Sequence, residues 1–174
     1  MWLVISVLLQ SLLRVYPIGV IFDQFGVARR RMTIDVDEKN RRLVKLAGSP
    51  NSRFWRTDYG ALSLSERVFR AVWELEAEVN NGGFLQYFSN STGSLVPDAA
   101  DALRAIGATT MSGIVEQAVE SVGHDISWSD DGARKAALAA LAPGALAKLG
   151  ECDQAFFAYP DNLTALLYKY VSEH

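Results

Sequence analysis

The chain has 174 residues, 49% of them hydrophobic, which excludes a disordered protein and allows one domain with its own core. Residues 1–56 carry ten Lys/Arg and four Asp/Glu, whereas residues 57–174 carry seven Lys/Arg and sixteen Asp/Glu, so a basic part precedes an acidic one. The single cysteine, Cys152, excludes an internal disulfide and multi-cysteine zinc sites, and a lone thiol is typical of the reducing cytoplasm.

Residues 1–31 form an apolar and basic leader. Residues 2–22 are mostly Leu, Val and Ile, with Arg14 and Pro17 among them, and three arginines follow at 29–31. This order does not fit a secretory signal, in which basic residues come before the apolar run. Three interpretations stay open: a membrane anchor, a packed core helix, or an extension before a true start at Met32. Each of them leaves the following domain in the cytoplasm.

Residues 32–56 predict a short β-hairpin and a linker. Residues 33–37 (TIDVD) and 41–46 (RRLVKL) read as two short strands around a turn at 37–40. Residues 47–51 (AGSPN) have the composition of a linker.

Residues 57–174 predict an acidic helical domain. Ser63 and Glu66 have the spacing of a capping box, and an apolar stripe with helical spacing follows. Gly82-Gly83 predicts the end of this helix, and residues 84–89 a short aromatic helix. The stripe consists of Val68, Val72, Leu75 and Val79.

Further helices follow in the same domain. Pro97 suits the first helical position of a helix that ends at Gly107, and a second stripe lies within residues 115–122. Residues 123–132 predict a loop, residues 134–149 an Ala-rich helix broken at Pro143-Gly144, and residues 163–171 a last helix. The fold class is therefore mainly α, a compact bundle of about six or seven helices.

The sequence offers little for catalysis. His124 and His174 are the two histidines, and no HExxH, GxSxG or phosphate-loop pattern occurs. Glu74 and Glu78 share one face of a helix from which Glu76 points away, so these carboxylates do not converge on a metal. We therefore expect no enzyme activity, no metal and no cofactor.

The run Asn80-Asn81-Gly82-Gly83 suits a sharp corner between two helices. Asn and Gly accept left-handed backbone angles, and Asn amides can bond the unpaired groups at helix ends. We expect Phe84, Tyr87 and Phe88 to turn inward from this corner. The alternative is a binding corner that presents the amides of Asn80, Asn81, Gln86 and Asn90 to a partner.

Three pairs of carboxylates lie at helical spacing: Glu74/Glu78, Asp98/Asp101 and Glu116/Glu120. Like charges at such spacing cost about 0.2–0.5 kcal/mol per pair, and few Lys or Arg lie near enough in sequence to offset them. These six residues are candidates for binding a basic partner, because a row of carboxylates can imitate a phosphate backbone. The alternative is an ordinary solvated face.

Residues 74–93 (ELEAEVNNGGFLQYFSNSTG), 99–108 (AADALRAIGA) and 153–174 (DQAFFAYPDNLTALLYKYVSEH) resemble the bacterial DNA-mimic protein family. The resemblance covers residues 57–174 and implies an all-helical, cytoplasmic, non-enzymatic protein whose acidic groups stand in for DNA phosphates. The motif positions that it carries over are Asn80, Asn81, Gly82, Gly83, Phe84, Gln86, Tyr87 and Phe88, and they look architectural.

The function that follows is a binding protein that occupies the DNA-binding surface of a basic partner such as a transcription regulator. An immunity-type protein that neutralises a toxin, for example a nuclease, is the alternative. We expect no direct binding of nucleic acid, because the domain would repel phosphate. Membrane contact is expected only through residues 2–22, and a homodimer remains open.

Overall fold

The structure is a computed structural model that describes residues 26–48 and 53–174. This part of the chain forms seven α-helices and contains no strand, so the predicted mainly α fold is confirmed. Three short 3-10 segments, η1 (Arg53–Trp55), η2 (Tyr59–Ala61) and η3 (Ser91–Leu95), connect some of the helices. The α-helices are α2 (Gly26–Gly48), α3 (Leu64–Ser89), α4 (Val96–Ile106), α5 (Thr109–Val122), α6 (Asp131–Ala139), α7 (Pro143–Phe157) and α8 (Leu163–Glu173).

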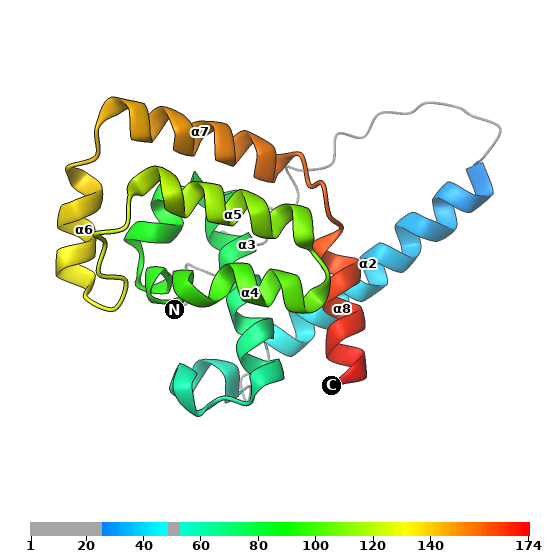
Figure 1. Cartoon of the computed structure of the whole chain (residues 1–174). Coiled ribbons are helices and arrows are strands. Elements are labelled where there is room, and N and C mark those ends of the chain that lie inside the picture. The colour runs from blue at the N-terminus through cyan, green and yellow to red at the C-terminus, as the bar shows by residue number, and fades with distance from the viewer. Residues whose placement is uncertain (1–25, 49–52) are drawn as a thin grey trace.

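Helix α3 is the central element of the bundle. It packs against α4, α6, α7 and α8, and α5 packs between α4 and α7 (Figure 1). The predicted stripe of α3 is fully buried in the core, where each large apolar side chain contributes about 1.5–3 kcal/mol. Helices α4, α5 and α7 therefore form one layer over α3.

The predicted helix ends are mostly confirmed. Ser63 and Glu66 form both hydrogen bonds of the capping box at the start of α3. Pro97 lies in the first turn of α4, which ends at Gly107 with φ 87°. The predicted Ala-rich helix is two separate helices, α6 and α7, and the break between them lies at residues 140–142, just before the predicted position at Pro143-Gly144.

The predicted hairpin and linker are corrected by α2. Residues 33–46 lie within this helix, which continues to Gly48 through the first two residues of the predicted linker. Leu43 and Ala47, four residues apart, are buried where α2 packs on α8, and Arg42 Nη1 donates to the Tyr168 hydroxyl over 2.9 Å. Burial of Leu43 and Ala47 thus stabilises a helix where residues 41–46 by themselves predicted a strand.

The apolar segment 2–22 lies outside the described residues. Within residues 26–48 and 53–174, no helix has the length and apolar character needed to cross a membrane.

Candidate functional site

The Asn-Gly corner is a tight bend inside α3. Gly82 has φ −163° and ψ 24°, and Gly83 has φ 76° and ψ −179°, so the helix is interrupted at the predicted place. The positive φ of Gly83 belongs to the region that favours glycine. A Cβ on Gly83 would lie 2.5 Å from Asp153 Oδ2, so this glycine is also needed for the close approach of α7.

The corner is held to the C-terminal part of the chain by two side-chain contacts. The backbone N–H of Phe84 donates to Asp153 Oδ1 over 2.7 Å. Asn80 Nδ2 donates to the Tyr159 hydroxyl over 2.5 Å, and that hydroxyl donates to Glu76 Oε1 over 3.0 Å. The Asp153 carboxylate serves as an N-cap, supplied by another helix, for the second half of α3.

The aromatic residues that follow the corner are core residues. Phe84, Tyr87 and Phe88 are fully buried, as predicted, and the Phe84 ring packs edge-on against Phe156 of α7 at 5.6 Å between centroids. Of the remaining motif residues, Asn81 and Gly82 are exposed, and Asn80 and Gln86 are half-buried.

Glu74 and Glu78 are half-buried and engaged within the protein. Arg70 Nε lies 3.1 Å from Glu74 Oε1, and Glu78 Oε2 accepts from Gln86 Nε2 over 2.8 Å and from Asn90 Nδ2 over 2.7 Å. Burial raises the pKa of Glu74, while Arg70 opposes this rise. Two of the amides of the predicted binding corner thus orient the Glu78 carboxylate.

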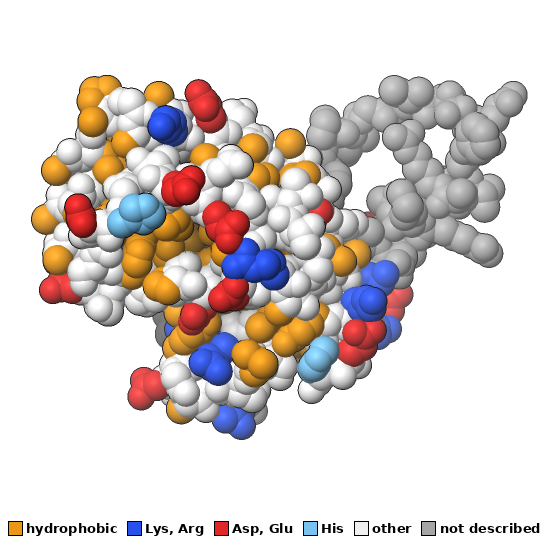
Figure 2. Space-filling model, in the orientation of Figure 1, with side chains coloured by type: hydrophobic (Ala, Val, Ile, Leu, Met, Phe, Trp, Pro, Cys, Tyr) orange, Lys and Arg blue, Asp and Glu red, His pale blue; other side chains and the backbone are white. Residues whose placement is uncertain are grey.

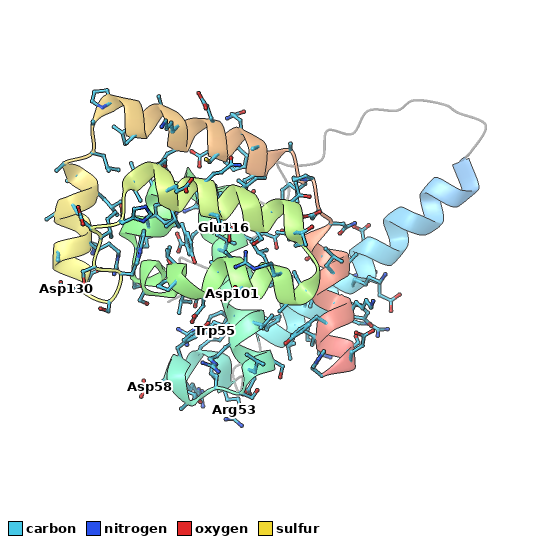
Figure 3. The ribbon with its side chains drawn as sticks, viewed as in Figure 1. Arg53, Trp55, Asp58, Asp101, Glu116 and Asp130 are labelled. Carbon is cyan, nitrogen blue, oxygen red and sulfur yellow. The ribbon has the colours of Figure 1, made fainter. Side chains whose placement is uncertain are left out.

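The other four candidate carboxylates are exposed on two neighbouring helices. Asp98 and Asp101 lie on α4, and Glu116 and Glu120 lie on α5. Figure 3 places Asp101 and Glu116 close together where α4 and α5 run side by side. Figure 2 shows acidic side chains over these two helices, with a basic side chain among them.

Arg104 joins the two helices through this acidic region. Its Nη2 lies 2.5 Å from Asp101 Oδ1 and its Nη1 lies 2.5 Å from Glu116 Oε1. The hydrogen bonds that Arg104 donates to Glu116 and Asp101 raise the pKa of its guanidinium. The expectation that few cations offset the acidic pairs is therefore wrong, since Arg70 pairs with Glu74 and Arg104 pairs with two carboxylates.

The Tyr87 side chain is buried and lies close enough to several carboxylates to feel their charge. Burial raises the pKa of Tyr87, and the charges of Glu74, Asp98 and Glu78 raise it further. Burial also raises the pKa of Tyr59, and the charge of Asp98 raises it further. The carboxylates of Glu74 and Glu78 on α3 and that of Asp98 on α4 thus raise the pKa of the same buried hydroxyl.

Several residues that organise this region gave no signal in the sequence. Arg134, 1% exposed, donates to the backbone carbonyls of Phe88, Trp128 and Asn90 and pairs with Asp131. Asp161 Oδ2 accepts from the backbone N–H of Met111 over 2.8 Å, near the start of α5. The contacts of Arg134 with Phe88 and Asn90, and that of Asp161 with Met111, join residues 44 to 50 positions apart, a separation that no local pattern can report.

Comparison with known proteins assigns residues 60–174 to a family. The family model described as DMP19-like protein matches residues 60–174, from η2 to the C-terminus. No curated protein and no solved structure gives a significant match. The match includes the Asn-Gly corner, the exposed carboxylates of α4 and α5, and Asp153, Tyr159 and Asp161. Since it spans well over half of the chain, the protein belongs to the DMP19-like family.

Proposed function

We propose that the protein is a non-enzymatic acidic binding protein that occupies the DNA-binding surface of a basic partner, such as a transcription regulator. The family takes its name from DNA mimic protein 19, and this membership supports the class of function. We place the binding activity in residues 57–174 and the protein in the cytoplasm, where DNA-binding regulators act.

The observation that carries the proposal is the set of exposed carboxylates on the adjacent helices α4 and α5. Asp98 and Asp101 are one turn apart on α4, and Glu116 and Glu120 are one turn apart on α5. The Cβ atoms of residues at this spacing lie about 5–6 Å apart, so two helices side by side present a two-dimensional array of negative charges. A DNA-binding surface is built to neutralise closely spaced negative charges, about one per 1.7 Å of duplex axis.

Glu74 and Glu78 contribute to this proposal in a different way. Their carboxylates are half-buried and bonded to Arg70, Gln86 and Asn90, so they are less free to contact a partner. Their charges nevertheless add to the negative potential beside Asp98. We therefore assign direct contact to the α4 and α5 carboxylates and a supporting electrostatic role to the α3 pair.

The test is a competition between the protein and DNA. The full chain and its Glu116→Lys/Glu120→Lys variant are immobilised and used to retain proteins from a nuclease-treated lysate of the native host. A DNA-binding protein that only the unchanged chain retains is then purified. It is mixed with a labelled DNA fragment to which it binds. We expect the full chain to displace this DNA in fluorescence anisotropy, and we expect salt to weaken the protein complex steeply.

Three results would count against this function. The retained protein could bind DNA and the chain at the same time, the double variant could retain it equally well, or salt could leave the affinity unchanged. Retention of a toxin that has no DNA-binding surface would support the immunity-type alternative instead.

A further inference from the structure

The guanidinium of Arg104 is shared between carboxylates from two helices. Its Nη2 contacts Asp101 Oδ1 within α4, and its Nη1 contacts Glu116 Oε1 on α5, each over 2.5 Å. Nη1 also donates to Ser112 Oγ over 2.9 Å. Asp101 and Glu116 therefore already stand at the separation at which two nitrogens of one guanidinium can reach both of them.

This contact lies on the surface. The side chains of Asp101, Glu116 and Arg104 are 79%, 54% and 45% exposed. Ion pairs at such exposure contribute little to folding stability, because water replaces the lost contact. The guanidinium can thus leave the carboxylates at small cost and keep Ser112 Oγ as a partner.

We infer that Asp101 and Glu116 form an arginine site which Arg104 of the chain itself occupies, and that an arginine of the basic partner takes its place on binding. This inference rests on the proposed function and adds the partner's chemistry to it. A guanidinium has donors in a planar fork that can reach two separate carboxylates, whereas an ammonium is a compact point charge. The site should therefore prefer an arginine-rich surface to a lysine-rich one, and Arg104 should act as a built-in competitor.

The experiment compares two charge-neutralising variants of the full chain. Arg104→Gln opens the site, and Lys45→Gln removes an equal charge from α2, which packs on α8 away from α4 and α5. The probes are fluorescein-labelled oligo-arginine and oligo-lysine peptides of equal length, and affinity is measured by anisotropy at low and high salt.

We expect Arg104→Gln to bind oligo-arginine about fivefold more tightly than the unchanged chain at low salt, the effect of one unit charge at about 4 Å in water. Lys45→Gln should bind it nearly as the unchanged chain does. The gain for oligo-lysine should be smaller than the gain for oligo-arginine.

Equal gains in both variants would overturn the inference, because net charge alone would then explain them. Weaker binding by Arg104→Gln would also overturn it, because Arg104 would then position the carboxylates for the partner. Charge reversal separates the inference from the function on which it rests. If Glu116→Lys weakens oligo-arginine binding but Arg104→Gln does not strengthen it, only the inference fails. If Glu116→Lys changes oligo-arginine affinity neither in the unchanged chain nor in the Arg104→Gln variant, the acidic face does not bind basic groups. The inference and the proposed function then both fail.

Discussion

The Asp153 carboxylate of α7 accepts a hydrogen bond of 2.7 Å from the backbone N–H of Phe84, 69 residues earlier in the chain. The contact is made where α3 restarts after its bend, and Gly83 leaves room for it because a Cβ there would lie 2.5 Å from the same carboxylate. A glycine that permits the bend and an aspartate that caps the new helix thus form one structural unit.

Gly83→Val should destabilise the fold by more than about 1 kcal/mol, since φ 76° is strained for a β-branched residue and its Cβ would collide with Asp153. The measurement is urea denaturation followed by circular dichroism. Gly113→Ala is the matched control, because nothing lies within 4 Å of the added Cβ in helix α5. This control should be neutral or stabilising, and equal losses in the two variants would show that the bend does not depend on glycine.

Asp153→Ala should cost about 1–2 kcal/mol, the range for loss of a helix N-cap. Asp153→Asn should recover part of this loss, because its amide oxygen can accept the same hydrogen bond. Asp125→Ala, a change in the exposed loop before α6, serves as the control in the same denaturation experiment. An Asp153→Ala chain as stable as the unchanged protein would contradict the capping role.

Arg134→Lys should destabilise the protein by about 2–3 kcal/mol, because an ammonium cannot reach the three carbonyls that the guanidinium satisfies. A Cβ on Gly93 would lie 2.7 Å from Arg134 Nε, so this glycine permits the close approach of the guanidinium. Lys135→Gln, one residue later, removes only an exposed ion pair with Asp131 and should cost less than about 0.5 kcal/mol. Calorimetric melting of both variants checks the contrast.

Glu76→Gln should raise the melting temperature at neutral pH and leave it unchanged in acid. Burial raises the pKa of Glu76, although the hydrogen bond from Tyr159 opposes this. The native chain therefore holds the Glu76 proton more tightly than the unfolded chain, so the stability that this group contributes is present in acid and is lost as pH rises through its folded pKa. The amide removes that loss and can still accept from Tyr159. Melting curves from about pH 4 to 8 test the effect.

Glu66→Gln provides a control of opposite sign for the same pH series. The backbone hydrogen bond from Ser63 lowers the pKa of Glu66, so its charge stabilises the folded chain above the unfolded pKa. This variant should melt below the unchanged protein at neutral pH, and the difference should vanish in acid. A Glu76→Gln difference that does not vary with pH would refute the assignment.

A chain that starts at Met32 should unfold cooperatively, because it retains Leu43 and Ala47 and hence the contact between α2 and α8. A chain that starts at Arg53 should be less stable by about 2 kcal/mol or more, the cost of removing a large buried apolar side chain. Thermal melting followed by circular dichroism compares the two. Equal melting temperatures would show that α2 does not stabilise the bundle. A molten Met32 product would instead indicate that residues within 1–31 take part in packing.

The sequence by itself determined the features that depend on neighbours in the chain. The capping box of Ser63 and Glu66, the end of α4 at Gly107 and the bend at Gly83 all follow from residues within about one helical turn. The inward turn of Phe84, Tyr87 and Phe88 was predictable for the same reason. Residues 33–46 were not predictable in this way. Their short alternating runs predicted strands, but they lie in α2, a helix that packs on α8.

Only the tertiary structure decided how distant charges and hydrogen-bonding groups combine. Asp153, Tyr159 and Asp161 satisfy groups in α3 and at the start of α5, and nothing near them in sequence indicates those partners. The acidic pairs were visible as spacing, but their environments were not. Glu74 and Glu78 are half-buried and internally bonded, whereas Asp101 and Glu116 share Arg104 at the surface. Helical spacing fixes which side chains share a face, and only the packing of one helix on another decides whether that face meets water, a cation or the core.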